Sequence, residues 1–120
     1  MLKDDLIRVR HLLDAAQKAV AFVQNKTRAD LDQNEQLALS LVRLLEIVGE
    51  SANTISDDFH SHYPDIPWRK MISLRNRLIH GYFDIDYNIV WDTVTNDLPS
   101  LIPMLEGILP SGNTTAQTES

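Results

Sequence analysis

The sequence predicts an all-α protein: an antiparallel bundle of four to five helices over residues 1–109, followed by a disordered tail over residues 110–120. Apolar residues recur at three- and four-residue steps along most of the chain, which is the spacing of one helix face. No stretch alternates apolar and polar residues for long enough to indicate a strand. Connections between the helical stretches are short, which favours antiparallel neighbours. With 120 residues and 43% hydrophobic content, the chain fits one globular domain.

The first helix is predicted over residues 2–25. Its apolar stripe follows helical spacing and consists of Leu2, Leu6, Val9, Leu13, Ala16, Val20 and Val23. The polar run over residues 25–30 ends this stripe, so we expect the helix to stop there.

A second, longer helix is predicted over residues 31–60. Asp32 opens it with Glu35 three residues later, a spacing in which each side chain can cap the other's backbone N–H. Its stripe consists of Leu37, Leu41, Leu44, Val48, Ala52 and Ile55. Three further apolar residues lie off the stripe: Leu39, Val42 and Ile47. This helix is therefore either the central one or the carrier of a face for a second subunit, and Gly49 within it indicates a close helix approach.

Two more helical stretches follow a proline-containing connection. Pro67 suits the first turn of a third helix, which runs to about Ile79 with Gly81 just past its end as a stop signal. A fourth stretch begins near Asp86 and contains two prolines that should kink or restart it, Pro99 and Pro103. The final eleven residues include no apolar residue larger than alanine, which predicts disorder.

Composition narrows the possible functions. The chain has no cysteine, which excludes disulfides, thiolate metal sites and cysteine nucleophiles. No run approaches the roughly 20 apolar residues of a membrane span, and charges interrupt the first residues where a signal peptide would be apolar. We therefore expect a cytoplasmic protein that does not enter a membrane. The net charge of −6 argues against a broad nucleic-acid-coating surface, so any contact with nucleic acid should be local.

One segment of the acidic chain is strongly basic. The window over residues 66–83 has no Asp or Glu, and it contains Arg69, Lys70, Arg75 and Arg77. A single basic window in an acidic protein indicates an anion site. The alternative is that these bases pair with the acidic fourth helix or with Glu46 and Glu50 of the second.

Arg75 occupies an unusual place on the helical wheel of the third helix. It projects from the middle of an apolar arc formed by Trp68, Met71, Ile72, Leu74, Leu78 and Ile79. A charge in such an arc requires either a partner or a function, and a guanidinium is suited to binding phosphate through two hydrogen bonds. Asn76 lies four residues before His80, so its side chain can orient the imidazole at the predicted helix end.

Two other histidines, His60 and His62, lie close to Asp57 and Asp58. Metal ligation is one interpretation, but cationic side chains also favour the carbonyl end of a helix, and no further ligand spacing supports a site. We expect no metal and no cofactor.

The residues around His80 resemble a known signature. The segment 75–82, Arg-Asn-Arg-Leu-Ile-His-Gly-Tyr, is similar to the Arg-x4-His-x-Tyr motif of the HepT-like family of HEPN domains. The flanking segments match as well: Ile66-Pro67-Trp68-Arg69, Phe83-Asp84-Ile85-Asp86, Ile89-Val90-Trp91, Asp97-Leu98-Pro99, and Glu46, Gly49, Glu50 and Ala52 in the second helix. The resemblance covers residues 2 to 109 and implies a HEPN-like helical bundle.

The resemblance also implies a function. It suggests the ribonuclease toxin of a prokaryotic type VII-like toxin–antitoxin system, a homodimer that cleaves RNA without metal. Its catalytic pair would be Arg75 and His80, supported by Asn76 and Arg77. The implied antitoxin is a nucleotidyltransferase of the MntA kind, which transfers AMP from ATP to Tyr82. The alternative is a noncatalytic module that binds nucleotide or RNA and forms a complex with a nucleotidyltransferase; the acidic total charge favours it, whereas the histidine at the helix end favours the enzyme.

Overall fold

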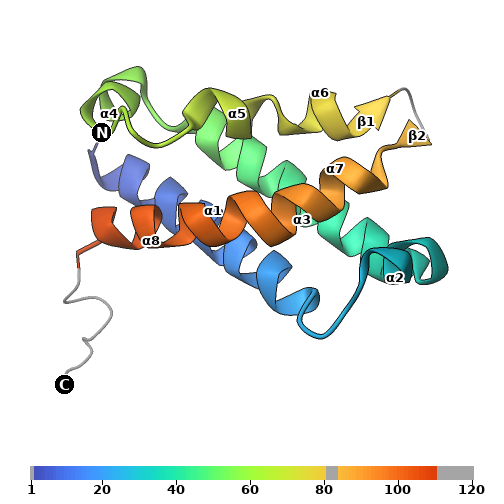
Figure 1. Ribbon diagram of the computed structural model, residues 1–120. Coiled ribbons are helices and arrows are strands. Elements are labelled where there is room, and N and C mark those ends of the chain that lie inside the picture. Colours follow the sequence, from blue (N-terminus) through green and yellow to red (C-terminus); the bar gives the residue numbers. More distant parts are fainter. Residues whose placement is uncertain (1, 81–83, 111–120) are drawn as a thin grey trace.

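The computed structural model describes residues 2–80 and 84–110 and confirms an all-α bundle (Figure 1). The tail predicted to be disordered lies outside these residues apart from Pro110. In chain order the elements are α1 (Leu2–Phe22), α2 (Arg28–Gln33), α3 (Glu35–Thr54), α4 (Asp57–His62), α5 (Trp68–Ile72), α6 (Leu74–Leu78), β1 (Ile79–His80), β2 (Asp84–Ile85), α7 (Tyr87–Asp92), the π-helical turn η1 (Thr93–Asp97) and α8 (Leu98–Ile108). The two-residue strands form a short ladder that the sequence did not predict.

Four rods make up the bundle, and consecutive rods run in opposite directions (Figure 1). They are α1, α3, the pair α5–α6, and the continuous run α7–η1–α8; α2 and α4 are short helices between them. The most extensive packing joins α1 to α3, with α8 against α1 and α5 against α3. Leucines from all four rods are fully buried in one core, including Leu12, Leu41, Leu45, Leu74, Leu78 and Leu105. Within the described ranges, no helix is long and apolar enough to cross a membrane.

The single helix predicted over residues 31–60 is wrong, because the chain divides there into α2, α3 and α4. Asn34 interrupts it first: its side chain accepts a hydrogen bond from the Leu37 N–H and so starts α3. Ser56 interrupts it again by accepting from the Phe59 N–H at the start of α4. These short polar side chains offer the backbone an alternative to a continuous helix.

Gly49 allows the close approach that its position predicted. A Cβ atom built on it would lie 2.9 Å from the backbone oxygen of Met71, so α5 rests directly on the backbone of α3. The contact fixes the start of the basic window against the central helix.

Asp5 is a buried carboxylate that joins the start of α1 to the α3–α4 junction. It is only 3% exposed, and it accepts hydrogen bonds from the Ser56 N–H at 2.9 Å and the Ser56 hydroxyl at 2.8 Å. Burial acts to raise the pKa of Asp5, but the two hydrogen bonds from Ser56 and the positive charge of Arg8 outweigh it, so its pKa lies below the ordinary value. The charged form therefore stabilises this corner of the bundle.

The fourth rod starts where the sequence predicts and stays continuous through its prolines. The Asp86 side chain caps α7 by accepting from the N–H groups of Asn88 and Ile89, both at 3.1 Å. Pro99 follows the π-helical turn η1, in which the wider spacing leaves room for a ring that would clash with the carbonyl four residues earlier in an α-helix. The helix thus changes type just before Pro99, while Pro103 lies inside α8 without ending it.

Candidate functional site

The four cations of the basic window lie on two short helices, α5 and α6, that meet at Ser73. The sequence predicted one helix to about Ile79, but the Ser73 hydroxyl donates to the Lys70 carbonyl at 3.1 Å and the chain turns there. The second helix ends at Leu78, and the following residues are extended. The residues before and after Ser73 therefore do not lie on one continuous helix.

Arg75 is placed differently from the prediction because of this break. Instead of projecting into the core, its side chain is 64% exposed, and its Nε donates to Glu46 Oε2 of α3 at 3.3 Å. Trp68 and Leu78, two members of the predicted apolar arc, are buried as expected. The partner that the sequence required for Arg75 is thus Glu46.

Glu46 is the centre of a small charge network on α3. Its second oxygen lies 3.6 Å from Arg43, and Arg43 also lies 3.7 Å from Glu50. The Glu46 side chain is only 20% exposed, against 61–64% for its three neighbours in the network, so it is the best fixed member. Its hydrogen bond to Arg75 uses Nε, and a guanidinium carries four further N–H donors on its terminal nitrogens. Arg75 can therefore stay paired to Glu46 while it donates to a phosphate.

Arg77 bridges the break between the two short helices. Its Nη2 donates to the Lys70 carbonyl at 2.9 Å and its Nε donates to the Ser73 hydroxyl at 3.3 Å, so its guanidinium lies back along α5. Lys70 itself pairs with Asp97 of η1 at 3.2 Å. The predicted alternative, in which the bases pair with the fourth helix and Glu46, therefore holds for Lys70 and Arg75.

Two open hollows adjoin these cations. One, of about 600 Å³, is lined by Arg69, Lys70, Ile72, Ser73 and Arg77. The other, of about 730 Å³, shares two of these residues and is lined by Asp57, His60, Ser61, Pro64, Ile66, Pro67, Trp68, Arg69 and Lys70. Sequence reasoning identified the cations but missed the second hollow, because the loop and α4 come beside α5 only in the folded chain.

The backbone of His80 is held in the short ladder. Ile79 pairs with Ile85 and His80 pairs with Asp84, while the Asp86 N–H donates to the Leu78 carbonyl at 2.7 Å. The His80 side chain lies outside what the structure describes, as does its predicted contact with Asn76, an exposed residue of α6. Tyr82, the predicted site of modification, falls within residues 81–83, which are also outside the described ranges.

The imidazole of His60 is held by contacts with the backbone of α3 and with Trp68. Its Nε2 lies 2.9 Å from the Ala52 carbonyl, and its ring stacks on Trp68 with 4.6 Å between centroids. In the part of the chain that the structure describes, no group of three or more His, Asp or Glu residues could hold a metal ion.

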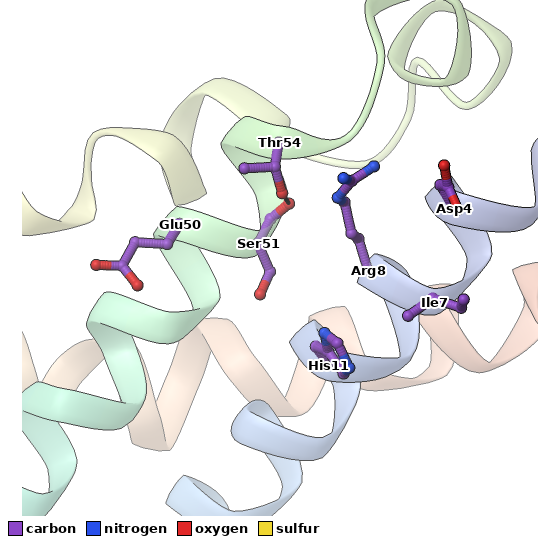
Figure 2. Close-up of a pocket in the computed structure, with 7 residues that line it drawn as sticks. All are labelled: Asp4, Ile7, Arg8, His11, Glu50, Ser51 and Thr54. Atoms are coloured by element: carbon purple, nitrogen blue, oxygen red, sulfur yellow. Dashed lines mark hydrogen bonds between the residues drawn. The ribbon is translucent and has the colours of Figure 1, made fainter. Parts of the chain in front are cut away.

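A further pocket, of about 320 Å³, lies between α1 and α3, away from the motif (Figure 2). Figure 2 shows Arg8 reaching from α1 toward Thr54, near the end of α3. The lining residues are Asp4, Ile7, Arg8, His11, Glu50, Ser51 and Thr54. Two carboxylates accompany its single arginine, so this pocket is less suited to a polyanion than the hollow beside Arg69 and Arg77.

Comparisons with known proteins agree with the family resemblance that the sequence indicates. A family model described as "Ribonuclease HepT-like" matches residues 12–108. A protein of Methanocaldococcus jannaschii named "Putative RNase MJ1380" is 36% identical over 90 residues, covering 75% of this chain and 83% of the relative. A protein of Thermococcus cleftensis named "Probable ribonuclease HepT" is 37% identical over 93 residues, covering 74% of this chain and 84% of the relative. No solved structure matches the chain.

Proposed function

Because the chain belongs to the ribonuclease HepT-like family, we propose that it is an endoribonuclease that cleaves RNA without metal through Arg75 and His80. One observation carries the proposal. Arg75 is held through Nε by Glu46, with its terminal nitrogens left to donate, and it lies five residues before His80 in a window without acidic residues. A fixed guanidinium can stabilise the charge of a phosphoryl transition state, and an imidazole can accept or donate a proton, so the two residue types are suited to phosphoryl transfer.

In the proposed reaction, His80 accepts the proton of a ribose 2′-OH. The 2′-oxygen forms a bond to phosphorus, and the bond from phosphorus to the 5′-oxygen breaks. Arg75 stabilises the negative charge that develops on the phosphate oxygens. The products are a 2′,3′-cyclic phosphate and a 5′-hydroxyl, and the leaving oxygen takes a proton from a second acid. Asn76 orients the imidazole and Arg77 supports the phosphate region.

The need for a second proton-transfer group in this reaction favours a homodimer. The motif has one histidine, whereas the reaction needs one proton accepted and one donated. A second copy of the chain can supply the donor if two motifs face one cleft. This is the dimer that the family resemblance implies.

The proposal extends to regulation by a toxin–antitoxin partner. A nucleotidyltransferase of the MntA kind would transfer AMP from ATP to Tyr82: the tyrosine oxygen bonds to the α-phosphorus, pyrophosphate leaves, and the phenolic proton passes to a base. The added phosphate and nucleoside, two residues from His80 in the chain, would exclude RNA by charge and by size.

Analysis of the RNA ends tests the reaction. Wild type should yield cyclic phosphate and 5′-hydroxyl ends, and both His80→Ala and Arg75→Ala should lose this activity while they remain folded by circular dichroism. Products with 5′-phosphate ends would contradict attack by the 2′-OH. Binding of RNA without cleavage would instead support the noncatalytic module, which the net charge of −6 favours.

A further inference from the structure

Two cations without a role in the proposed cleavage, Arg69 and Lys70, lie with Arg77 on one surface of α5 and α6. Arg69, Lys70 and Arg77 line the same hollow of about 600 Å³, which contains no lining carboxylate. Asp97 pairs with Lys70 at its edge, so three positive charges stand against one negative charge. In a chain of net charge −6, this is a local reversal of sign.

The individual contacts make this surface suited to a polyanion. Arg69 is exposed and makes no ion pair or side-chain hydrogen bond in the part of the chain that the structure describes. Arg77 donates to the Lys70 carbonyl and the Ser73 hydroxyl, which turns its guanidinium back toward α5. Its charge therefore lies close to Lys70 and the adjacent Arg69, so the three cations can act on one stretch of a polyanion.

The adjoining hollow adds apolar surface next to the same cations. Pro64 and Pro67 are exposed there, and the half-buried His60 lies beside them. An apolar surface next to cations can cover a base by hydrophobic contact while the cations attract the phosphates of the same strand. Asp57, on the rim, is the one opposing charge among the residues that line this hollow.

We propose that these two hollows form a binding path for single-stranded RNA beyond the cleaved bond: Arg69 binds the phosphates of flanking nucleotides in the positive field of Lys70 and Arg77, and a base lies against Pro64 and Pro67. The inference rests on the proposed ribonuclease function for the identity of the ligand. The path adjoins α6, which ends at Leu78, two residues before His80 in the chain. Asp97 limits the contribution of Lys70 to this path.

Binding to a substrate that cannot be cleaved tests the path separately from catalysis. The probe is a labelled single-stranded 12-nucleotide RNA with 2′-O-methyl riboses, measured by fluorescence anisotropy between 50 and 200 mM salt. Arg69→Ala should weaken binding and reduce the slope of log affinity against log salt by about 0.7, the value for one lost phosphate contact on a single strand. When the salt rises from 50 to 200 mM, the factor by which the affinity of Arg69→Ala falls should be about 2.6 times smaller than the factor for wild type. Asp97→Asn should bind more tightly, because it releases Lys70.

Arg10→Ala is the matched control. Arg10 is an exposed arginine of α1 without an ion pair in the described residues. Its replacement removes the same charge as Arg69→Ala, but at a position away from the path. Its salt slope should equal that of wild type. The path is refuted if Arg69→Ala and Arg10→Ala have the same slope, or if Asp97→Asn fails to bind more tightly.

A second measurement distinguishes the path from the proposed enzyme. With cleavable RNA, Arg69→Ala should raise KM and leave kcat unchanged, because flanking contacts are equal in the ground and transition states. If wild type binds the probe with the expected dependence on Arg69 but leaves cleavable RNA intact, the ribonuclease proposal fails and the path stands. A lower kcat with unchanged KM would place Arg69 in the reaction and overturn the path.

Discussion

Replacing Glu46 with alanine tests whether the observed ion pair positions Arg75. Glu46 makes two pairs, at 3.3 Å to Arg75 and 3.6 Å to Arg43, with partners more than 60% exposed. Exposed pairs contribute about 0.2–1 kcal/mol each. Glu46→Ala should therefore lower the free energy of unfolding by only about 1 kcal/mol, and the protein should remain folded.

The effect on catalysis should be larger than the effect on stability. Without Glu46 the Arg75 guanidinium loses its observed hydrogen bond, and a misplacement of about 1 Å in a catalytic group can reduce the rate about 100-fold. We expect kcat to fall about 10- to 100-fold with little change in KM. Glu46→Gln should retain part of the activity, because its amide oxygen can still accept from Nε. The assay is steady-state RNA cleavage, paired with urea unfolding.

Glu50→Ala is the matched control for this experiment. Glu50 lies on the same helix, carries the same charge and pairs only with Arg43 among the ion pairs of the described residues. Its removal should leave kcat within about twofold of wild type, since surface pairs have small effects. Equal losses in the two variants would refute positioning by Glu46. A gain in activity for Glu46→Ala would show that Glu46 competes with the phosphate for Arg75.

Three further predictions concern packing, pH and modification. Gly49→Ala should lower the free energy of unfolding in urea by about 1–3 kcal/mol, because the added Cβ would meet a backbone oxygen of α5 at 2.9 Å. Gly107→Ala is the control: nothing lies within 4 Å of its Cβ position, so its stability should be unchanged or higher by up to about 1 kcal/mol. The same loss of stability at both sites would contradict the close contact at Gly49. The pKa of Asp5 is lowered in the fold, so the stability that its charge contributes is fully present well above the unfolded pKa of about 4 and is lost as pH falls through the folded pKa. Asp5→Asn should therefore lower the free energy of unfolding at pH 7 and lower it much less at pH 2. An equal loss at both pH values would show that the charge of Asp5 does not stabilise the fold. Tyr82→Phe should gain no AMP by mass spectrometry after incubation with ATP and the partner enzyme, and an adduct on it would place the modification elsewhere.

The hydrophobic pattern predicted the bundle and most of its core but not its helix breaks. Periodicity reports which face of a helix turns to the core: Val9, Leu41 and Val48 of the predicted stripes are fully buried. Leu12 and Leu45, which lie beside those stripes, are fully buried as well. Periodicity does not report whether the backbone stays helical between stripes. Asn34 and Ser56 are signals that the sequence does contain, since both are short polar residues that favour caps.

The site was predictable in residue identity and less so in geometry. A basic window and a motif can be read directly from residues 66–83, whereas the placement of Arg75 depends on the break at Ser73 and on Glu46, which lies 29 positions away in the chain. The sequence offered Glu46 as one of several acidic partners for these bases, but spacing along the chain does not say which of them comes into contact. The second hollow is of the same kind, because Pro64 and Lys70 come together only through the packing of the loop on α5.

Cleavage of RNA by unmodified protein, produced without its partner and verified by mass, tests the central claim most directly. The reaction is run in EDTA with wild type and His80→Ala side by side. The account predicts that wild type cuts and the folded variant does not. Intact RNA with the wild-type protein, or equal cleavage by both proteins, would contradict a metal-independent ribonuclease that depends on His80.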